Sequence, residues 1–137
     1  MDRASGTQDN ATCGDPNADR HRFGGYNVSV LAGSAVNGIT VRLDAFASGP
    51  LDSAAICVEL SWDGGATWTS TQTTAALSAV QGTYLVGGAA DNWGRTWSAT
   101  DLANGSFVVR LTDVAAKKKS KDFRLDWVAV DVTYTPP

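Results

Sequence analysis

The sequence has little of what enzymes use for acid–base chemistry. His21 is the only histidine among its 137 residues, and Glu59 is the only glutamate. Glu59 falls in the middle of a segment with strand character, and the Gly-x-Ser-x-Gly pattern of many hydrolases is absent. A pair of aspartates could still act as in glycosidases. A domain of this size has little surface for a cleft, however, so we expect a protein that is not an enzyme.

Long apolar segments are also missing. No run approaches the length of a membrane span, and Met1 is followed by the polar stretch DRASGTQDNATCGDPNADR rather than by a signal peptide. The formal net charge of −3 argues against a nucleic-acid partner. We therefore expect neither membrane insertion nor nucleic-acid binding, and an exported chain would be seen here in its mature form.

Cysteine is scarce, and its spacing excludes most metal sites. The two cysteines, Cys13 and Cys57, do not form a Cys-x-x-Cys motif, and one histidine is too few for a zinc site. The simplest interpretation is a disulfide that ties the N-terminal segment to a strand in an oxidising compartment. Two unrelated thiols remain the alternative.

The residues that are abundant favour short strands and turns. The chain is 43% hydrophobic and 18% charged, with 14 glycines and many threonines, valines, alanines and serines. A helix bundle would need more Glu, Lys and Leu. The length fits one domain, which we place at residues 21–135 after a surface segment of residues 1–20.

Alternating segments predict the strands of that domain. Residues 39–46 alternate cleanly, and residues 55–62 place Ile56, Val58, Leu60 and Trp62 on one face. Residues 25–31 alternate weakly. Residues 123–135 form the longest candidate strand, expected to be central in a sheet or bulged because both faces turn apolar. Seven or eight short strands, with at most one helical turn near residues 98–103, predict an all-β antiparallel sandwich of jelly-roll type.

The stretch SWDGGATWT fits an Asp-box, the turn motif that recurs in sialidases. Its motif residues are Ser61, Asp63, Gly65, Thr67 and Trp68. A propeller glycosidase needs several four-stranded blades, for which this chain is too short. Asp63 can instead accept hydrogen bonds from the backbone of its own turn, and the glycines can take positive φ. We therefore expect a structural hairpin.

The segments VELSWDGGATWT, DNWGRTWSATDLANGSFVVRLTDV and FRLDWVAVDVTYT together resemble a module of large exported bacterial surface proteins, often from Chloroflexi-like or metagenomic sources. The N-terminal RHRFGGYNVSV and AVNGITVRLDA fit the same pattern, so the resemblance covers most of residues 13–135. It implies an extracellular β-sandwich, usually one unit among many, with neighbouring domains or copies of itself as partners. The two cysteines stand where that family often carries a pair.

A weaker resemblance links FRLDWVAVDV to jelly-roll carbohydrate-binding modules, in which the equivalent aspartate helps to hold a structural calcium. The resemblance makes Asp126 a candidate calcium ligand. A hydrogen bond from Asp126 to a neighbouring loop is the alternative, because one aspartate supplies few of the oxygens that calcium needs.

Tryptophan is plentiful, with five in the chain. Because tryptophan rings stack on sugars, Trp93 and Trp97 are candidate glycan contacts, with Arg95 between them and Asp91 nearby. The alternative is that both rings pin their loop to the sandwich. The remaining three, Trp62, Trp68 and Trp127, are expected in the core.

The lysine-rich run at 117–121 is expected to be a solvated turn, with contact to anionic polymers as the alternative. Two functions therefore stand: a non-catalytic structural or display module at the cell surface, and a polysaccharide-binding module that uses exposed tryptophans.

Overall fold

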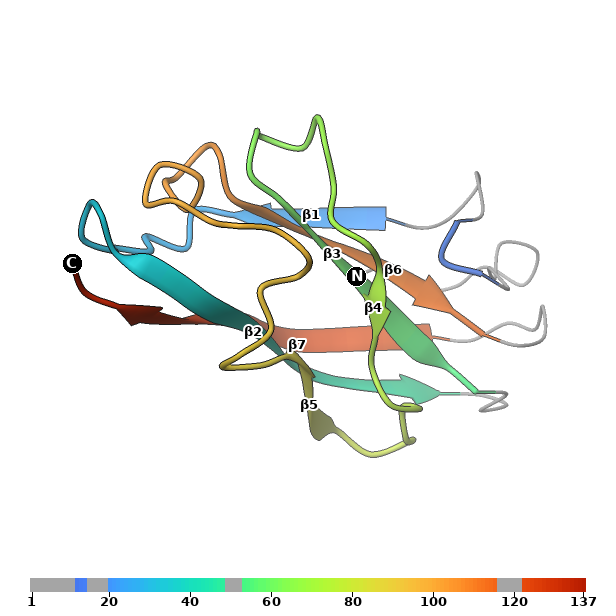
Figure 1. Cartoon of the computed structure of the whole chain (residues 1–137). Coiled ribbons are helices and arrows are strands. Elements are labelled where there is room, and N and C mark those ends of the chain that lie inside the picture. Colours follow the sequence, from blue (N-terminus) through green and yellow to red (C-terminus); the bar gives the residue numbers. More distant parts are fainter. Residues whose placement is uncertain (1–11, 15–19, 49–52, 116–121) are drawn as a thin grey trace.

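The computed structural model describes residues 12–14, 20–48, 53–115 and 122–137, and their strands form two antiparallel sheets packed against each other (Figure 1). The four-stranded sheet has the order β1-β6-β3-β4, and the three-stranded sheet has the order β5-β2-β7. The strands are β1 (Arg20–Gly24), β2 (Ala35–Ser48), β3 (Ala55–Ser61), β4 (Gln72–Thr73), β5 (Gly82–Gly87), β6 (Val108–Val114) and β7 (Asp122–Thr135). The predicted all-β antiparallel sandwich is confirmed.

The core lies between the sheets and follows the alternation of the sequence. The inward side chains of β2, β3 and β6 are fully or almost fully buried, because each strand turns every second residue toward the opposite sheet. They include Ile39, Val41, Leu43, Ile56, Val58, Leu60, Val109 and Leu111. The loop between β5 and β6 adds Trp93, Trp97, Leu102 and Phe107 to this core.

The strand β7, which at 14 residues is as long as β2, is an edge strand and not a central one. It pairs with β2 alone, so the prediction of a central position is wrong. The prediction of a bulge is correct, since the pairing register shifts between Asp44 and Ala45. Asp44 lies opposite Trp127 and Ala45 opposite Leu125, which leaves Asp126 as the extra residue of β7.

Two further segments differ from expectation. Residues 25–31 belong to no strand, although Tyr26, Val28 and Val30 alternate inward and pack against the core. Residues 98–103 form turns and no helix. Ser98 and Asp101 exchange the reciprocal side-chain-to-backbone bonds of a helix start, at 2.8 and 3.2 Å, but a turn rather than a helix follows.

Two predictions concern residues outside this description. The lysine-rich run at 117–121 lies outside the described residues, as does most of the segment 1–20. Within the part of the chain that is described, no helix is long and apolar enough to cross a membrane.

Candidate functional site

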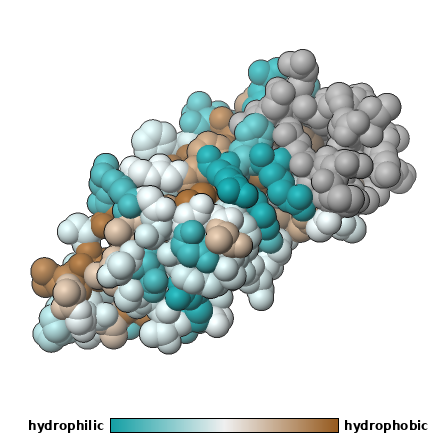
Figure 2. All heavy atoms as spheres, turned by 90° about the horizontal axis from the view of Figure 1, so that it is seen from above, coloured by the Kyte–Doolittle hydropathy of each residue, from teal (hydrophilic) through white to brown (hydrophobic). Residues whose placement is uncertain are grey.

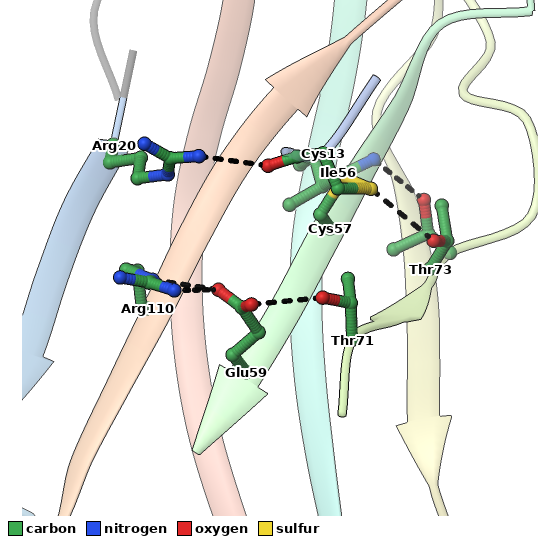
Figure 3. The surroundings of a disulfide bond; sticks show 9 residues. Cys13, Arg20, Ile56, Cys57, Glu59, Thr71, Thr73 and Arg110 are labelled. Atoms are coloured by element: carbon green, nitrogen blue, oxygen red, sulfur yellow. Dashed lines mark hydrogen bonds and ion pairs between the residues drawn. A yellow bond between two sulfur atoms is a disulfide. The ribbon is translucent and has the colours of Figure 1, made fainter. Parts of the chain in front are cut away.

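A disulfide joins Cys13 to Cys57, as the sequence predicts (Figure 3). Cys57 is buried in β3, in the middle of the four-stranded sheet, and the two Cα atoms are 5.9 Å apart. Arg20 at the start of β1 donates a 3.0 Å hydrogen bond to the backbone oxygen of Cys13. The disulfide therefore fastens residues 12–14 to the outer face of the sheet.

The only glutamate is occupied by a structural network on the same face (Figure 3). Arg110 donates to Glu59 Oε2 from Nε at 2.7 Å and lies 2.6 Å from it through Nη2. Thr71 donates to Oε1 at 2.8 Å. Glu59 and Arg110 face each other in register on β3 and β6. A carboxylate held on both oxygens in this way is an ion pair between strands rather than a free acid or base.

The Asp-box forms a turn that satisfies its own polar groups. Asp63 Oδ1 accepts from the backbone N–H groups of Thr67 at 2.8 Å and Ala66 at 3.0 Å. It also accepts from the Ser61 hydroxyl at 2.8 Å, while Ser61 Oγ accepts from the N–H of Gly65 at 2.8 Å. These bonds, that of the Thr67 backbone first, lower the pKa of Asp63 to about 2.

The tryptophan of this motif lies over arginines of the four-stranded sheet. The guanidinium carbon of Arg110 is 4.1 Å from the centre of the Trp68 ring, and that of Arg22 is 5.2 Å away. Gly65 takes φ +96° beneath this cluster, a conformation that favours glycine. Trp68 is half-buried rather than a core residue, and it closes the hairpin by cation–π contact.

Trp93 and Trp97 do not present their faces to solvent. They are only 4% and 2% exposed. Trp93 Nε1 donates to the backbone oxygen of Ile39 at 2.8 Å, and Trp97 Nε1 donates to that of Asn92 at 2.7 Å. The prediction of a sugar platform on these two rings is wrong, because stacking needs an accessible ring face. The alternative is correct, since both rings pin the loop to the sandwich.

Asp91 and Arg95 belong to the same internal arrangement. Asp91 accepts from the Trp93 backbone at 2.8 Å and from the Gln72 amide at 2.9 Å, and its own backbone oxygen accepts from Ile39 at 3.0 Å. The Arg95 guanidinium lies between the rings of Trp62 and Trp97. The structure thus brings the four predicted glycan contacts together, but as a packed loop.

Trp127 is the most exposed of the tryptophans, so the expectation that it lies in the core is wrong. It is 57% exposed. Its register partner is Asp44 on β2. Asp44 points to the same face as the exposed Arg42, two residues earlier in β2. Trp127 therefore lies on the outer face of the three-stranded sheet. The bulge at Asp126 explains this position, because it lets Leu125 face the core while Trp127 faces outward.

A groove runs beside this residue, between the free edges of β1 and β7. Its volume is about 280 Å³, and its lining consists of Phe23, Gly24, Tyr26, Leu125, Asp126, Trp127 and Val128. Burial raises the pKa of the Tyr26 hydroxyl. Among the described residues of the lining, Asp126 is the only acidic one.

Hydrophobic residues are also exposed elsewhere on the surface. In Figure 2 hydrophilic residues run along the middle of the face that is seen from above, and hydrophobic residues gather at the end away from the grey atoms. Among the described residues, the other large apolar side chains with more than half of their surface exposed are Leu31, Val80 and, on the three-stranded sheet, Leu85.

The calcium prediction at Asp126 stays a prediction. Asp126 is exposed, and its Oδ2 accepts a 3.3 Å hydrogen bond from the Gln81 amide, as the alternative expects. Among the described residues no group of three or more His, Cys, Asp or Glu side chains could hold a metal ion.

No protein-family model matches the chain, and no curated protein or solved structure does so either. The resemblance to modules of exported bacterial proteins therefore remains an expectation from the sequence.

Proposed function

We propose that the chain is a non-catalytic structural module of an extracellular or cell-surface protein, which holds neighbouring domains or copies of itself at a fixed spacing. The observation that carries this proposal is the disulfide between Cys13 and Cys57. Such bonds persist in oxidising compartments. This one ties the segment before the sandwich to the middle of a sheet, which suits a domain that must keep its form outside the cell.

The contacts that the polar side chains of the sequence motifs make within the fold support a structural role. Glu59 is held by Arg110 and Thr71, Asp63 by its own turn, and Asp91 by Trp93 and Gln72. Each group stabilises a strand pair, a turn or a loop and has its partners within the fold. The strongest sequence motifs of the chain are thus fold determinants.

The arrangement of the chain supports the role of a spacer. The disulfide-tethered residues 12–14 lie near one end of the sandwich, and the C-terminal residues lie at the other (Figure 1). β7 leads to this second end and is paired with β2 over nearly its whole length. A pull between the two ends would therefore load a covalent bond on one side and a long strand pair on the other.

The test places the domain between two fluorescent proteins and measures their separation by small-angle X-ray scattering, with and without reductant. A rigid spacer gives one narrow distance distribution in the oxidised state, which broadens after reduction. A broad distribution in the oxidised protein would contradict the spacer role. Turnover of any substrate from a panel of glycosides, esters and peptides would contradict the non-catalytic assignment.

A further inference from the structure

The β-bulge of β7 places two consecutive side chains on one face of the sheet. Leu125 lies opposite the buried Ala45, and Trp127 lies opposite Asp44, so the register passes over Asp126. The Asp126 carboxylate accepts a 3.3 Å bond from Gln81, which precedes β5 on the far side of β2. Ala45 of β2, which lies opposite Leu125, points into the core. The hydrogen bond between Gln81 and Asp126 therefore passes over the opposite, outer side of the sheet. Asp126 and Trp127 therefore share the outer face.

Trp127 stands at the end of a row of hydrogen-bonding groups. Asp44 lies directly opposite it on β2, and Thr83 lies opposite Asp44 on β5. The Thr83 hydroxyl donates to Asp44 at 2.8 Å, and Arg42 donates to both carboxylate oxygens at 3.1 and 3.0 Å. These hydrogen bonds fix the side chains of the row without a ligand. The row crosses three strands and is therefore about 10 Å long.

The fold does not require an aromatic ring at this position. The other outward residues of β7 near it, Arg124, Asp126, Ala129 and Asp131, are small or charged. Burial of its ring would stabilise the domain, yet more than half of Trp127 is in contact with solvent. A large ring exposed among planar polar groups is the arrangement that lets a ligand stack on the ring and form hydrogen bonds beside it.

We infer that this outer face binds a neutral polysaccharide, with one pyranose ring stacked on Trp127 and its hydroxyl groups bonded to Asp126, Gln81 and Arg42. Arg42 has N–H groups beyond the two that it gives to Asp44, and the Gln81 amide oxygen and Asp126 Oδ1 can accept. This inference goes beyond the structural role proposed above and does not depend on it.

The charges of the site select a neutral sugar. Arg42 neutralises Asp44, and the exposed Arg124 lies 3.8 Å from Asp122, whereas Asp126 has no ion-pair partner within the described residues. A uronate or sulfate group beside Trp127 would meet this carboxylate at close range. Neutral hydroxyl groups would instead donate hydrogen bonds to it.

A second copy of the chain fits the face less well. Leu85 is 65% exposed on the same face, but it is separated from Trp127 by the ion pair of Arg42 and Asp44. Protein interfaces are depleted of charged residues at their centre, because burial there removes the charges from water. Sugar hydroxyl groups could keep these charges hydrogen-bonded.

The groove between β1 and β7 continues the site past the edge of the sheet. Trp127 belongs both to the outer face and to the lining of the groove. The groove has a volume of about 280 Å³, which is small compared with most ligand pockets of about 300 to 1,000 Å³. It suits the next sugar unit of a chain better than a separate ligand.

The experiment is affinity electrophoresis of the oxidised protein in gels with xyloglucan, mixed-linkage β-glucan, galactomannan or the anionic polygalacturonate, together with pull-down on cellulose. We expect retention on at least one neutral polymer and none on polygalacturonate. Trp127→Ala should weaken this retention roughly tenfold or more, and Asp126→Asn should weaken it less. Leu85→Ala, an exposed change on the same face, should leave it within about twofold. Near-ultraviolet circular dichroism checks that each variant is folded.

Three results would overturn the inference. The first is a lack of retention on all the neutral polymers. The second is retention that folded Trp127→Ala leaves unchanged. The third is a dimer of the wild-type protein in analytical ultracentrifugation that Trp127→Ala converts to monomer, which would assign the face to a second copy of the chain.

Discussion

The guanidinium carbon of Arg95 lies 3.9 Å from the centre of the Trp62 ring and 4.6 Å from that of Trp97. Trp62 follows β3, whereas Arg95 and Trp97 belong to the loop between β5 and β6. One planar cation thus joins the two segments. Its contact with Asp101, at 3.5 Å, is long, so the rings are its main partners.

Removal of this cation should destabilise the domain. Each cation–π contact contributes about 0.5–2 kcal/mol, so we expect Arg95→Ala to lower the free energy of unfolding by about 1–3 kcal/mol. Arg95→Lys keeps the charge but loses the flat stacking group, and its effect should be intermediate. Urea unfolding followed by tryptophan fluorescence measures both. Arg124→Ala, at an exposed arginine of β7, is the control, and an equal effect of the two alanine variants would contradict the stacking role.

Reduction of the disulfide should also lower stability. Cys13 and Cys57 are 44 residues apart, and a loop of this length contributes about 4 kcal/mol through the entropy of the unfolded chain. Urea unfolding of one preparation, before and after reduction confirmed by thiol titration, gives the difference directly. The Cys13→Ser/Cys57→Ala variant should match the reduced protein. An unchanged midpoint after complete reduction would show that the bond constrains nothing.

The local patterns of the sequence predicted the parts of the fold that depend on nearby residues. Alternation at residues 39–45 identified the buried face of β2, because a strand turns every second side chain inward. The spacing of Ser61, Asp63 and Gly65 predicted the self-contained turn, whose bonds span no more than four residues. Two cysteines allow only one pairing, so the sequence identified the partners of the disulfide, but it left two free thiols as the alternative.

The parts that depend on distant contacts could not be predicted. Whether β7 lies at an edge depends on the order of strands, which its own residues do not encode. The exposure of Trp127 follows from a bulge that both β2 and β7 determine. The burial of Trp93 depends on the Ile39 carbonyl across the sandwich. Because the candidate site follows from the bulge, it emerges only from the structure.

Gly38 in β2 and Gly88 directly after β5 offer a matched pair of substitutions. A Cβ atom at Gly38 would lie against the backbone of Gly88 and Ala89, where nothing flexible can move away, while a Cβ atom at Gly88 meets nothing within 4 Å. We expect Gly38→Ala to cost about 3 kcal/mol or more and Gly88→Ala to stay within about 0.5 kcal/mol. Thermal unfolding of both variants compares them. Equal stabilities would mean that the loop after β5 does not pack on β2 as described.

The last prediction concerns acid stability and Asp63. The hydrogen bonds of its turn, that from the Thr67 backbone first, lower its pKa from 3.8 to about 2. A carboxyl group whose pKa is lower in the folded protein stabilises it fully above the unfolded value, and this contribution is lost as the pH falls toward the folded value. We therefore expect the stability difference between wild type and Asp63→Asn to be constant above about pH 5 and to shrink between pH 3.8 and about pH 2. Urea midpoints at a series of pH values measure it. A difference that stays constant down to pH 2 would show that the Asp63 carboxylate charge contributes nothing to the turn.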